Sequence, residues 1–306
     1  MLNAAVDSYL TQRRAAGFQL KDHERVLHDF ARFAHTRGDA FVRSTSVLDW
    51  IRDRDGSPLR SHIRLQMVIH LARYLHAEDD RHEIPPTKVL GRPHLPKRRP
   101  PFLFTPAQVA ALVREAGTLG PESSLLPGVY STLFGLLACT GLRISEAVNL
   151  RLEDMTPDGL IVRNTKFGKS RFLALHASTR KVLEQYIERR GQEAGACPYL
   201  IVSVNGRQLH RNTARVVFRR LVGLLGIGKT DDKPCPRMHD LRFYFANQVM
   251  ENSPDDREGI SRQMVALTTY LGHSDVRNSY WYLEASPQLL SRIAETCESF
   301  VKGENR

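Results

Sequence analysis

Cysteine, long apolar runs and negative charge are all scarce in this sequence of 306 residues. The four cysteines are scattered, too few for a disulfide framework or a complete set of zinc ligands. The longest nearly uncharged stretch, residues 125–142, contains a proline and three glycines, whereas a membrane-spanning helix needs about 20 predominantly apolar residues. The first residues are charged and lack the apolar segment of a signal peptide. We therefore expect a cytoplasmic protein with reduced cysteines, no metal and no membrane insertion.

The shortage of acidic residues points to a polyanionic partner. The chain has 44 lysines and arginines against 33 aspartates and glutamates, giving a net charge of +11 and an isoelectric point near 9.7. Hydrophobic residues make up 42% of the chain and charged residues 25%, as in an ordinary folded protein. Because membrane insertion is excluded, the basic excess favours nucleic acid as the partner.

The chain divides most clearly at residues 88–101, a stretch rich in proline and basic residues. Prolines prevent a regular helix there and favour an extended chain, so this segment is predicted to be a linker. Residues 1–87 carry apolar residues at helical spacing and predict a bundle of about four short helices. Ser46 is the expected N-cap of the third helix, which would begin at Val47.

The second domain, residues 102–306, is predicted to begin with two helices. Thr105, followed by a proline and then by Gln108, is typical of a helix N-terminus. An apolar helix is predicted around residues 129–139, and Gly141 is placed to end it.

A small amount of β structure follows these helices. Two apolar segments, residues 160–163 and 171–175, flank the glycine-containing stretch 165–169 and predict a β-hairpin. Further helical segments run from there toward the C-terminus. The expected fold class is therefore mostly α with a small β component (α+β), built as a helical N-terminal domain, a linker and a mixed second domain.

Four side chains that bear chemistry follow the linker, and each has an ordinary explanation when taken alone. Arg143, after a helix end, reads as an exposed surface arginine, and Lys166, at the hairpin tip, as a solvated charge. His239 and Arg242 are three residues apart, so on a helix they share one face and form a local polar pair. None of these interpretations implies a function.

Two more candidates lie near the C-terminus, and the complete set is far more specific. His273 follows a glycine, and Tyr282 ends a Tyr-Trp-Tyr segment; a capping histidine and a core tyrosine are their plain interpretations. Together, however, an arginine, a lysine on a hairpin, His-x-x-Arg, Gly-His and a tyrosine nine residues further on resemble the catalytic signature of the tyrosine recombinase (phage integrase) family. The matching stretches are residues 140–150, 165–171, 238–245 and 270–283. The hairpin and the Tyr-Trp-Tyr ending resemble integrases of bacterial mobile elements.

This resemblance implies a site-specific DNA recombinase. Members of the family attack a DNA phosphodiester with a tyrosine, which leaves a 3′-phosphotyrosyl intermediate and a free 5′-hydroxyl. Bond energy is conserved in that intermediate, so neither ATP nor another high-energy cofactor is required. The fixed cations of the family's site take the place of a metal ion, so the resemblance implies no metal. Residues 1–87 match the family's core-binding domain, and residues 102–306 its catalytic domain. A type IB topoisomerase-like relaxase and a non-catalytic DNA-binding accessory protein are the alternatives.

The resemblance assigns the central roles residue by residue. Tyr282 is the nucleophile. Arg143 and Arg242 clamp the nonbridging oxygens of the scissile phosphate, because planar guanidinium groups bind such oxygens in a bidentate manner. His273 donates a further hydrogen bond to the same phosphate.

The resemblance also assigns the proton transfers. Lys166 protonates the leaving 5′-oxygen as general acid, although Lys169, three residues further on, is an alternative. His239 assists proton transfer at the tyrosine. Glu146 aligns with the acidic position beside the first arginine and supports the site.

Two features leave room for other assignments. Tyr280 competes with Tyr282 as the nucleophile, and the spacing from His273 favours Tyr282. The family commonly has a histidine directly after the second arginine, where this chain has Phe243. That departure bears on core packing more than on chemistry.

The expected partner is double-stranded DNA, bound by a homo-tetramer on paired sites, alone or with sister recombinases. Members of the family pass a C-terminal helix to a neighbouring subunit, and residues 288–301, with apolar residues along one side, are the candidate helix. Lys97, Arg98 and Arg99 of the linker are expected to contact the DNA backbone, with a solvated charge run as the alternative.

Overall fold

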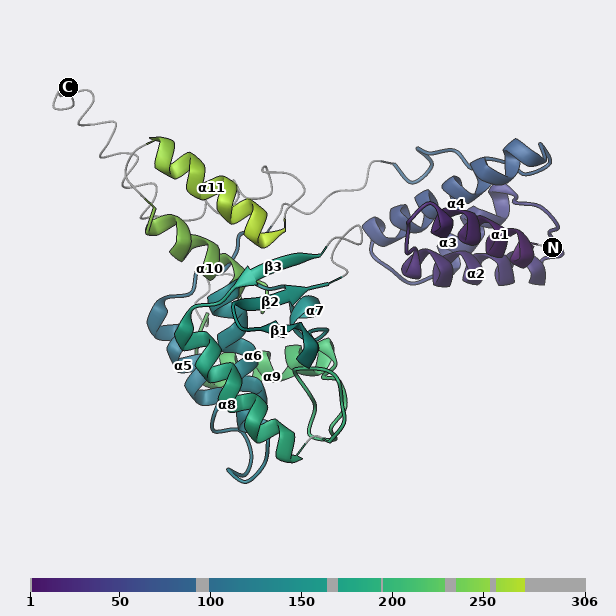
Figure 1. Ribbon diagram of the computed structural model, residues 1–306. Helices are drawn as coiled ribbons and strands as arrows, with labels where there is room; N and C mark the ends of the chain where they lie inside the picture. Colours follow the sequence, from purple (N-terminus) through teal and green to yellow (C-terminus); the bar gives the residue numbers. More distant parts are fainter. Residues whose placement is uncertain are drawn as a thin grey trace, which may run out of the picture. The chain divides into compact units, whose positions relative to one another are not determined.

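The computed structural model describes residues 2–91, 99–163, 170–193, 195–228, 235–253 and 257–272. The chain divides into two compact units, residues 1–98 and 99–306. Helices predominate in both units, and the second also contains a three-stranded sheet (Figure 1). The expected fold class, mostly α with a small β component, is therefore confirmed. No helix in the described ranges is long and apolar enough to cross a membrane.

The described residues of the first unit form a four-helix bundle, as their apolar spacing predicted. Its helices are α1 (Leu2–Ala15), α2 (Lys21–Thr36), α3 (Ser44–Asp53) and α4 (Pro58–Glu78). In its core the ring of Phe30 lies edge-on to that of Trp50, with 5.4 Å between the centroids. The Trp50 indole N–H donates to the Asp29 carboxylate at 3.0 Å, so the ring is buried with its polar atom satisfied.

Helix α3 begins earlier than predicted, and the prediction of Ser46 as its N-cap is wrong. Ser46 lies inside the helix, buried, and its hydroxyl donates to Asp39. The helix begins at Ser44, whose backbone N–H donates to the Glu83 carboxylate at 2.8 Å. Glu83 lies 39 residues further along the chain, so the cap comes from the segment that follows α4.

In the second unit, helices surround a small sheet. Its helices are α5 (Pro106–Ala116), α6 (Leu126–Thr140), α7 (Ile144–Ala147), α8 (Ala177–Glu193), α9 (Arg211–Leu224), α10 (Asp240–Glu251) and α11 (Arg257–Leu271), with a short 3-10 turn at Leu152–Asp154. The predicted start of α5 is confirmed, because Thr105 and Gln108 form a reciprocal capping box.

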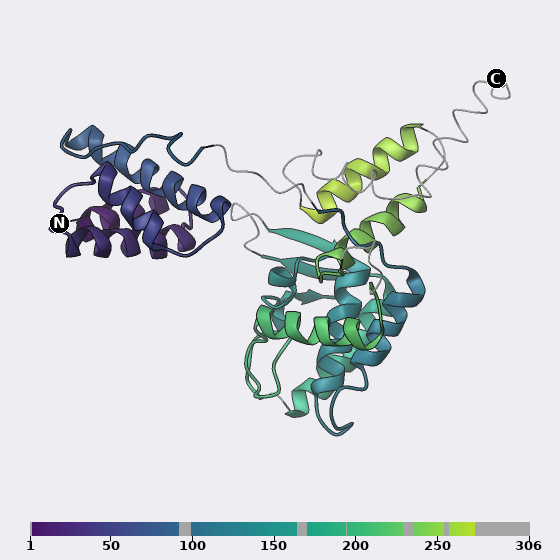
Figure 2. The same ribbon diagram turned by 180° about the vertical axis from the view of Figure 1, so that it is seen from behind.

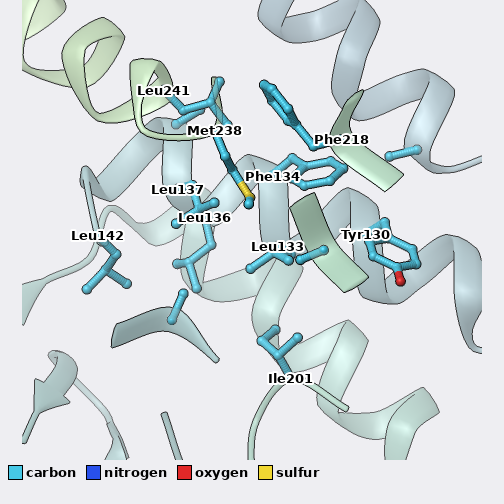
Figure 3. Close-up of a cluster of buried hydrophobic side chains, with 14 of the residues drawn as sticks. Tyr130, Leu133, Phe134, Leu136, Leu137, Leu142, Ile201, Phe218, Met238 and Leu241 are labelled. Atoms are coloured by element: carbon cyan, nitrogen blue, oxygen red, sulfur yellow. The ribbon is translucent and has the colours of Figure 1, made fainter. Parts of the chain in front are cut away.

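Helix α6 is the centre of this unit. It contacts α5, α8 and α10, and most of its side chains are buried. Figure 3 shows Leu133, Phe134 and Leu137 of α6 in the cluster, with Phe134 beside Phe218 of α9 at 5.6 Å between ring centroids. The helix ends at Thr140 before Gly141, as predicted. Its C-terminal end is therefore held rigidly by the core.

The sheet has the order β1-β2-β3 and is antiparallel. Its strands are β1 (Met155–Thr156), β2 (Gly159–Val162) and β3 (Arg171–Ala174). Strands β2 and β3 form the predicted hairpin, and their ladder ends at the pair Val162 and Arg171. The hairpin tip, residues 164–169, lies outside the described residues. Strand β1 was not predicted.

Helices α10 and α11 pack against each other in a second, smaller core. Phe243 and Met250 of α10 are buried against Leu267 and Leu271 of α11. The two helices lie side by side in Figure 1 and again from behind in Figure 2. Contacts of α10 with α6 and of α11 with β3 bring this pair to the C-terminal end of α6.

Candidate active site

The site is built around the turn that ends α6. Gly141 adopts a left-handed conformation, with φ of 62°. A Cβ atom here would lie 2.6 Å from the Phe245 ring and 2.9 Å from the Leu271 side chain, so α10 and α11 both pack closely against this turn. After the turn, Leu142 enters the core, and Arg143 follows with its side chain 31% exposed.

Glu146 of α7 holds Arg143 in place. The Arg143 guanidinium donates from Nη1 to Glu146 Oε1 at 2.7 Å, and the Arg143 backbone N–H donates to Oε2 at 3.0 Å. Only 8% of the Glu146 side chain is exposed. The two residues predicted to lie together in the site therefore do so, with the carboxylate inside and the guanidinium facing outward.

A second arginine, Arg171 at the start of β3, binds the same carboxylate. Its Nη1 and Nη2 donate to the two oxygens of Glu146 at 3.1 and 2.8 Å. Burial opposes ionisation of Glu146, but the hydrogen bonds and charges of Arg171 and Arg143 more than offset it and lower its pKa to about 2. Glu146 is therefore an anion at neutral pH, and its oxygens accept four hydrogen bonds.

Arg242 of α10 joins three segments of the site. Its Nη1 donates to the Gly141 carbonyl at 2.6 Å, and its Nη2 donates to the Leu271 carbonyl at 2.8 Å. The residue is only 1% exposed. The guanidinium therefore links the end of α6 to the end of α11.

His239 lies directly before α10 and is exposed. Its ring lies edge-on to Phe243, with 5.7 Å between the centroids. Phe243, which stands where the family commonly has histidine, is 4% exposed and belongs to the core of α10 and α11. His239 and Arg242 thus begin one helix, with the histidine outside and the arginine inside.

Several predicted residues lie outside the described residues. They are Lys97, Arg98, Lys166, Lys169, His273, Tyr280, Tyr282 and the candidate C-terminal helix 288–301. The described segments nonetheless lead to two of these positions. Strands β2 and β3 flank the hairpin tip that contains Lys166 in the sequence. Helix α11 ends two residues before His273. The first residue of β3 is Arg171, and carbonyls at the end of α11 accept hydrogen bonds from Arg171 and Arg242.

Of the predicted linker contacts, Arg99 is described. It is exposed, and one of its Nη atoms donates to the carbonyl of Cys235. Among the described residues, no group of three or more histidine, cysteine, aspartate or glutamate side chains is arranged to hold a metal ion.

Two features of the structure were not predicted from the sequence. Arg171 was predicted only as part of a strand, and its partners lie 25 and 99 residues away in the chain. Helix α9 carries four exposed arginines and no acidic residue, and among the described residues none of the four forms an ion pair. The four are Arg211, Arg215, Arg219 and Arg220. The four-residue spacing of the first three was a signal available in the sequence.

The chemistry that this arrangement supports is recognition of a phosphate diester. The guanidinium groups of Arg143 and Arg171 bond to one buried carboxylate, and Arg242 bonds to the Gly141 carbonyl, two residues before Arg143. Guanidinium groups in such an excess attract phosphate and stabilise charge that develops on its oxygens. With the fold, the cluster defines the class: the catalytic domain of a tyrosine recombinase.

Comparisons with known proteins agree. The model of the phage integrase family matches residues 103–288. A candidate integrase/recombinase of Sinorhizobium fredii, y4rB, is 36% identical over 303 residues, which cover 96% of each chain. A solved structure of the XerH site-specific recombinase bound to palindromic difH substrate, a post-cleavage complex, aligns with a TM-score of 0.63 and 16% identity, over 97% of this chain and 85% of that one. A lambda integrase tetramer bound to a Holliday junction aligns with a TM-score of 0.60 and 16% identity, over 90% and 77%.

The chain belongs to the phage integrase family, and it is a tyrosine-type site-specific DNA recombinase. The family membership that the sequence motifs implied is thereby confirmed. The two structural alignments, at 16% identity, concern the fold alone.

Proposed function

We propose that this chain cuts and rejoins double-stranded DNA at specific sites through a 3′-phosphotyrosyl intermediate, with Tyr282 as its nucleophile. The observation that carries the proposal is the cluster in which Arg143 bonds to Glu146 while Arg242 bonds to the carbonyl of Gly141, two residues before Arg143. Hydrogen bonds connect the end of α6, the end of α11 and the start of β3 at this cluster. These segments lie next to the sequence motifs of the family. The sequence places Tyr282 nine residues after His273, within reach of that cluster in the family pattern.

Strand cleavage exchanges one phosphodiester for another. The Tyr282 oxygen forms a bond to phosphorus while the bond from phosphorus to the 5′-oxygen breaks. His239 takes the phenolic proton, and Lys166 gives a proton to the leaving 5′-oxygen. A free tyrosine has a pKa near 10, so attack at neutral pH needs a concentrated positive field. Rejoining runs the same steps in reverse with a 5′-hydroxyl as nucleophile, which requires no ATP and no other cofactor.

The phosphate clamp consists of Arg143, Arg242 and His273. Arg143 is partly exposed, and Glu146 holds only one side of its guanidinium, so its other N–H groups can face the nonbridging oxygens. Arg242 is 1% exposed, so DNA binding must uncover it before it can donate to phosphate. Because these cations belong to the chain, they supply the charge that Mg²⁺ supplies in metal-dependent nucleases.

DNA binding extends over both units. We assign residues 1–87 as the core-binding domain, residues 88–101 as a linker along the DNA backbone, and residues 102–306 as the catalytic domain. The arginines of α9 support a phosphate contact in the second unit, because they are exposed and no acidic residue on that helix offsets them.

The proposal includes the oligomeric state of the protein and its location in the cell. The chain acts as a homo-tetramer on paired sites, alone or with sister recombinases, with residues 288–301 as the exchanged helix. The lambda integrase tetramer on a Holliday junction, which shares the fold, supports this assembly. Because the substrate is DNA, we place the protein in the cytoplasm.

Nicked suicide duplexes test this function. The probes tile both junctions of the DNA element that carries the gene, and a covalent protein–DNA band on a denaturing gel is the readout. We expect an adduct on particular junction sequences and none on scrambled duplexes. Relaxation of supercoiled plasmids that lack those junctions would instead favour the topoisomerase-like activity. Specific binding without an adduct would favour the accessory protein.

A further inference from the structure

Arg171 lies in the candidate active site, but the proposed mechanism assigns it no role. Its side chain is 12% exposed, and three of its nitrogens donate hydrogen bonds. Two of these bonds go to the Glu146 carboxylate, side by side, and Glu146 in turn binds Arg143. Arg171 therefore reaches the proposed phosphate clamp through one intervening residue.

The third bond of Arg171 goes to a different part of the site. Its Nε donates to the carbonyl of Tyr270, the next-to-last residue of α11, at 3.0 Å. Gly272, which follows α11, has φ of 67° and also lies against Arg171. A Cβ atom on Gly272 would be 3.0 Å from Nη1 and 3.2 Å from Cδ of that arginine. The backbone that leads directly into His273 thus rests on the Arg171 side chain.

We propose that Arg171 is a positioning residue for DNA cleavage, one that fixes the Arg143 guanidinium through Glu146 and the start of the His273 segment through the Tyr270 carbonyl. The proposal rests on the function proposed above. A planar guanidinium suits this task because its fork and its Nε–H point in fixed, different directions. Two sides of the phosphate site thereby take their relative placement from one side chain.

The alternative is that Arg171 binds the DNA itself. The geometry disfavours this, because the side chain is nearly buried and its charge is compensated by the Glu146 carboxylate. Tyr270 also faces Arg171, and burial raises its phenol pKa to about 12, so it stays neutral near physiological pH. Glu146 is therefore the titratable group whose pKa depends on Arg171.

Two substitutions at this position test the proposal against a matched control. Arg171→Gln removes the charge and the fork, while Arg171→Lys keeps the charge without the fork. The control is Arg189→Gln, because Arg189 of α8 also donates to backbone carbonyls, those of Glu122 and Ser124, and touches neither Glu146 nor α11. Single-turnover cleavage of the junction duplexes at saturating protein is measured together with DNA affinity and melting temperature.

We expect Arg171→Gln to slow cleavage by about 10²-fold, the scale of a small displacement of catalytic groups, with DNA affinity and its salt dependence unchanged. Arg171→Lys should lie between that variant and the wild type. Arg189→Gln should cleave at the wild-type rate.

The pH profile separates positioning from a general structural role. Without the Arg171 charge, the pKa of Glu146 rises, so Glu146 becomes protonated as the pH falls and releases Arg143. The ratio of the Arg171→Gln rate to the wild-type rate should therefore drop as the pH falls toward 4.5, the ordinary pKa of a glutamate. Arg171→Lys should lack this drop because its charge keeps Glu146 ionised. In the double variant Arg171→Gln/Glu146→Gln the drop should disappear, because no carboxylate is left to titrate.

Three results would overturn the inference while leaving the proposed function intact. They are wild-type cleavage rates in the Arg171 variants, a rate ratio that does not change with pH, and a loss of DNA affinity with a flatter salt dependence. If Arg171→Gln does not fold, Arg171→Lys decides the matter through its rate alone, and a wild-type rate counts against positioning. A wild-type protein that forms no adduct overturns the proposed function and this inference with it.

Discussion

Arg242 donates a hydrogen bond of 2.6 Å to the carbonyl oxygen of Gly141, which lies 101 residues earlier in the chain. Its second Nη donates to Leu271 at the end of α11. Arg143, the other arginine of the proposed clamp, is 31% exposed and forms its side-chain bond to a residue three positions away. The two clamp arginines therefore contribute differently to the fold, although we assign them the same chemistry.

Conservative substitution should separate these contributions. Arg143→Lys and Arg242→Lys each lose the planar fork, so cleavage should fall by about 10²–10³-fold in both, the scale for one transition-state donor. Arg242→Lys should also destabilise the chain, because a buried carbonyl left without a donor costs about 1–3 kcal/mol. Single-turnover cleavage and thermal melting provide the two readouts. A near-wild-type rate in either variant, or an unchanged melting temperature in Arg242→Lys, would contradict this account.

The assignment of the nucleophile predicts a sharp difference between two tyrosines. Tyr282→Phe removes only a hydroxyl, so folding and DNA binding should persist while the covalent adduct disappears. Tyr280→Phe should still form the adduct. Both variants are compared on the same suicide duplex by denaturing gel electrophoresis. Adduct formation by Tyr282→Phe together with its loss in Tyr280→Phe would move the nucleophile to position 280.

The low pKa of Glu146 predicts how stability depends on pH. Its pKa is lowered from an ordinary 4.5 to about 2, so its contribution is complete above pH 4.5 and is lost as the pH falls through 2. That shift corresponds to about 3 kcal/mol at neutral pH. Glu146→Gln should therefore be less stable than the wild type at pH 7 by up to that amount, and the difference should shrink below pH 4.5. Urea unfolding across this range measures it, and a difference independent of pH would argue against the ion pairs.

Local patterns predicted most of the fold. The capping sequence at Thr105, the glycine that ends α6 and the two apolar segments of the hairpin each depend on neighbouring residues, and each was predicted from them. The start of α3 was not, because its cap is Glu83, 39 residues away. Strand β1 has two residues, too few for an alternating pattern.

In the candidate active site, too, contacts between neighbouring residues were predicted and contacts between distant residues were not. The family resemblance placed Glu146 beside Arg143, and the two residues, three positions apart, form an ion pair. It gave no indication of Arg171, whose partners come from α7 and from the end of α11. Nor did it indicate that Arg242 is buried beneath the turn at Gly141, since a motif specifies residue order and not depth. Such tertiary contacts emerge only when the helices pack.

Cleavage should persist in the presence of EDTA. The positive charge at the phosphate comes from side chains such as Arg143 and Arg242, and chelation cannot remove them. Adduct formation on the suicide duplex is compared with and without EDTA after dialysis against the chelator. Loss of cleavage that Mg²⁺ alone restores would indicate a metal-dependent mechanism and would contradict the proposed roles.

Two basic segments should contribute to DNA affinity through the phosphate backbone. Triple replacement of Lys97, Arg98 and Arg99 by glutamine should weaken binding similarly on all sequences. It should also flatten the dependence of log K on log salt by up to about 0.9 per lost contact, about 2.7 at most. Arg99 bonds to the Cys235 carbonyl, so its share should be smaller than that of a freely exposed cation.

Helix α9 provides the matched comparison for the linker. Arg215 and Arg219 are exposed one turn apart on the same face, so Arg215→Gln/Arg219→Gln should flatten the salt dependence by up to about 1.8. Both sets of variants should cleave at nearly the wild-type rate at saturating DNA, because neither set changes Arg143, Glu146 or Arg242. Fluorescence titrations at a series of salt concentrations, on junction and scrambled duplexes, measure the slopes. An unchanged slope would mean that the segment faces solvent, and a loss confined to the junction duplex would mean that it reads bases.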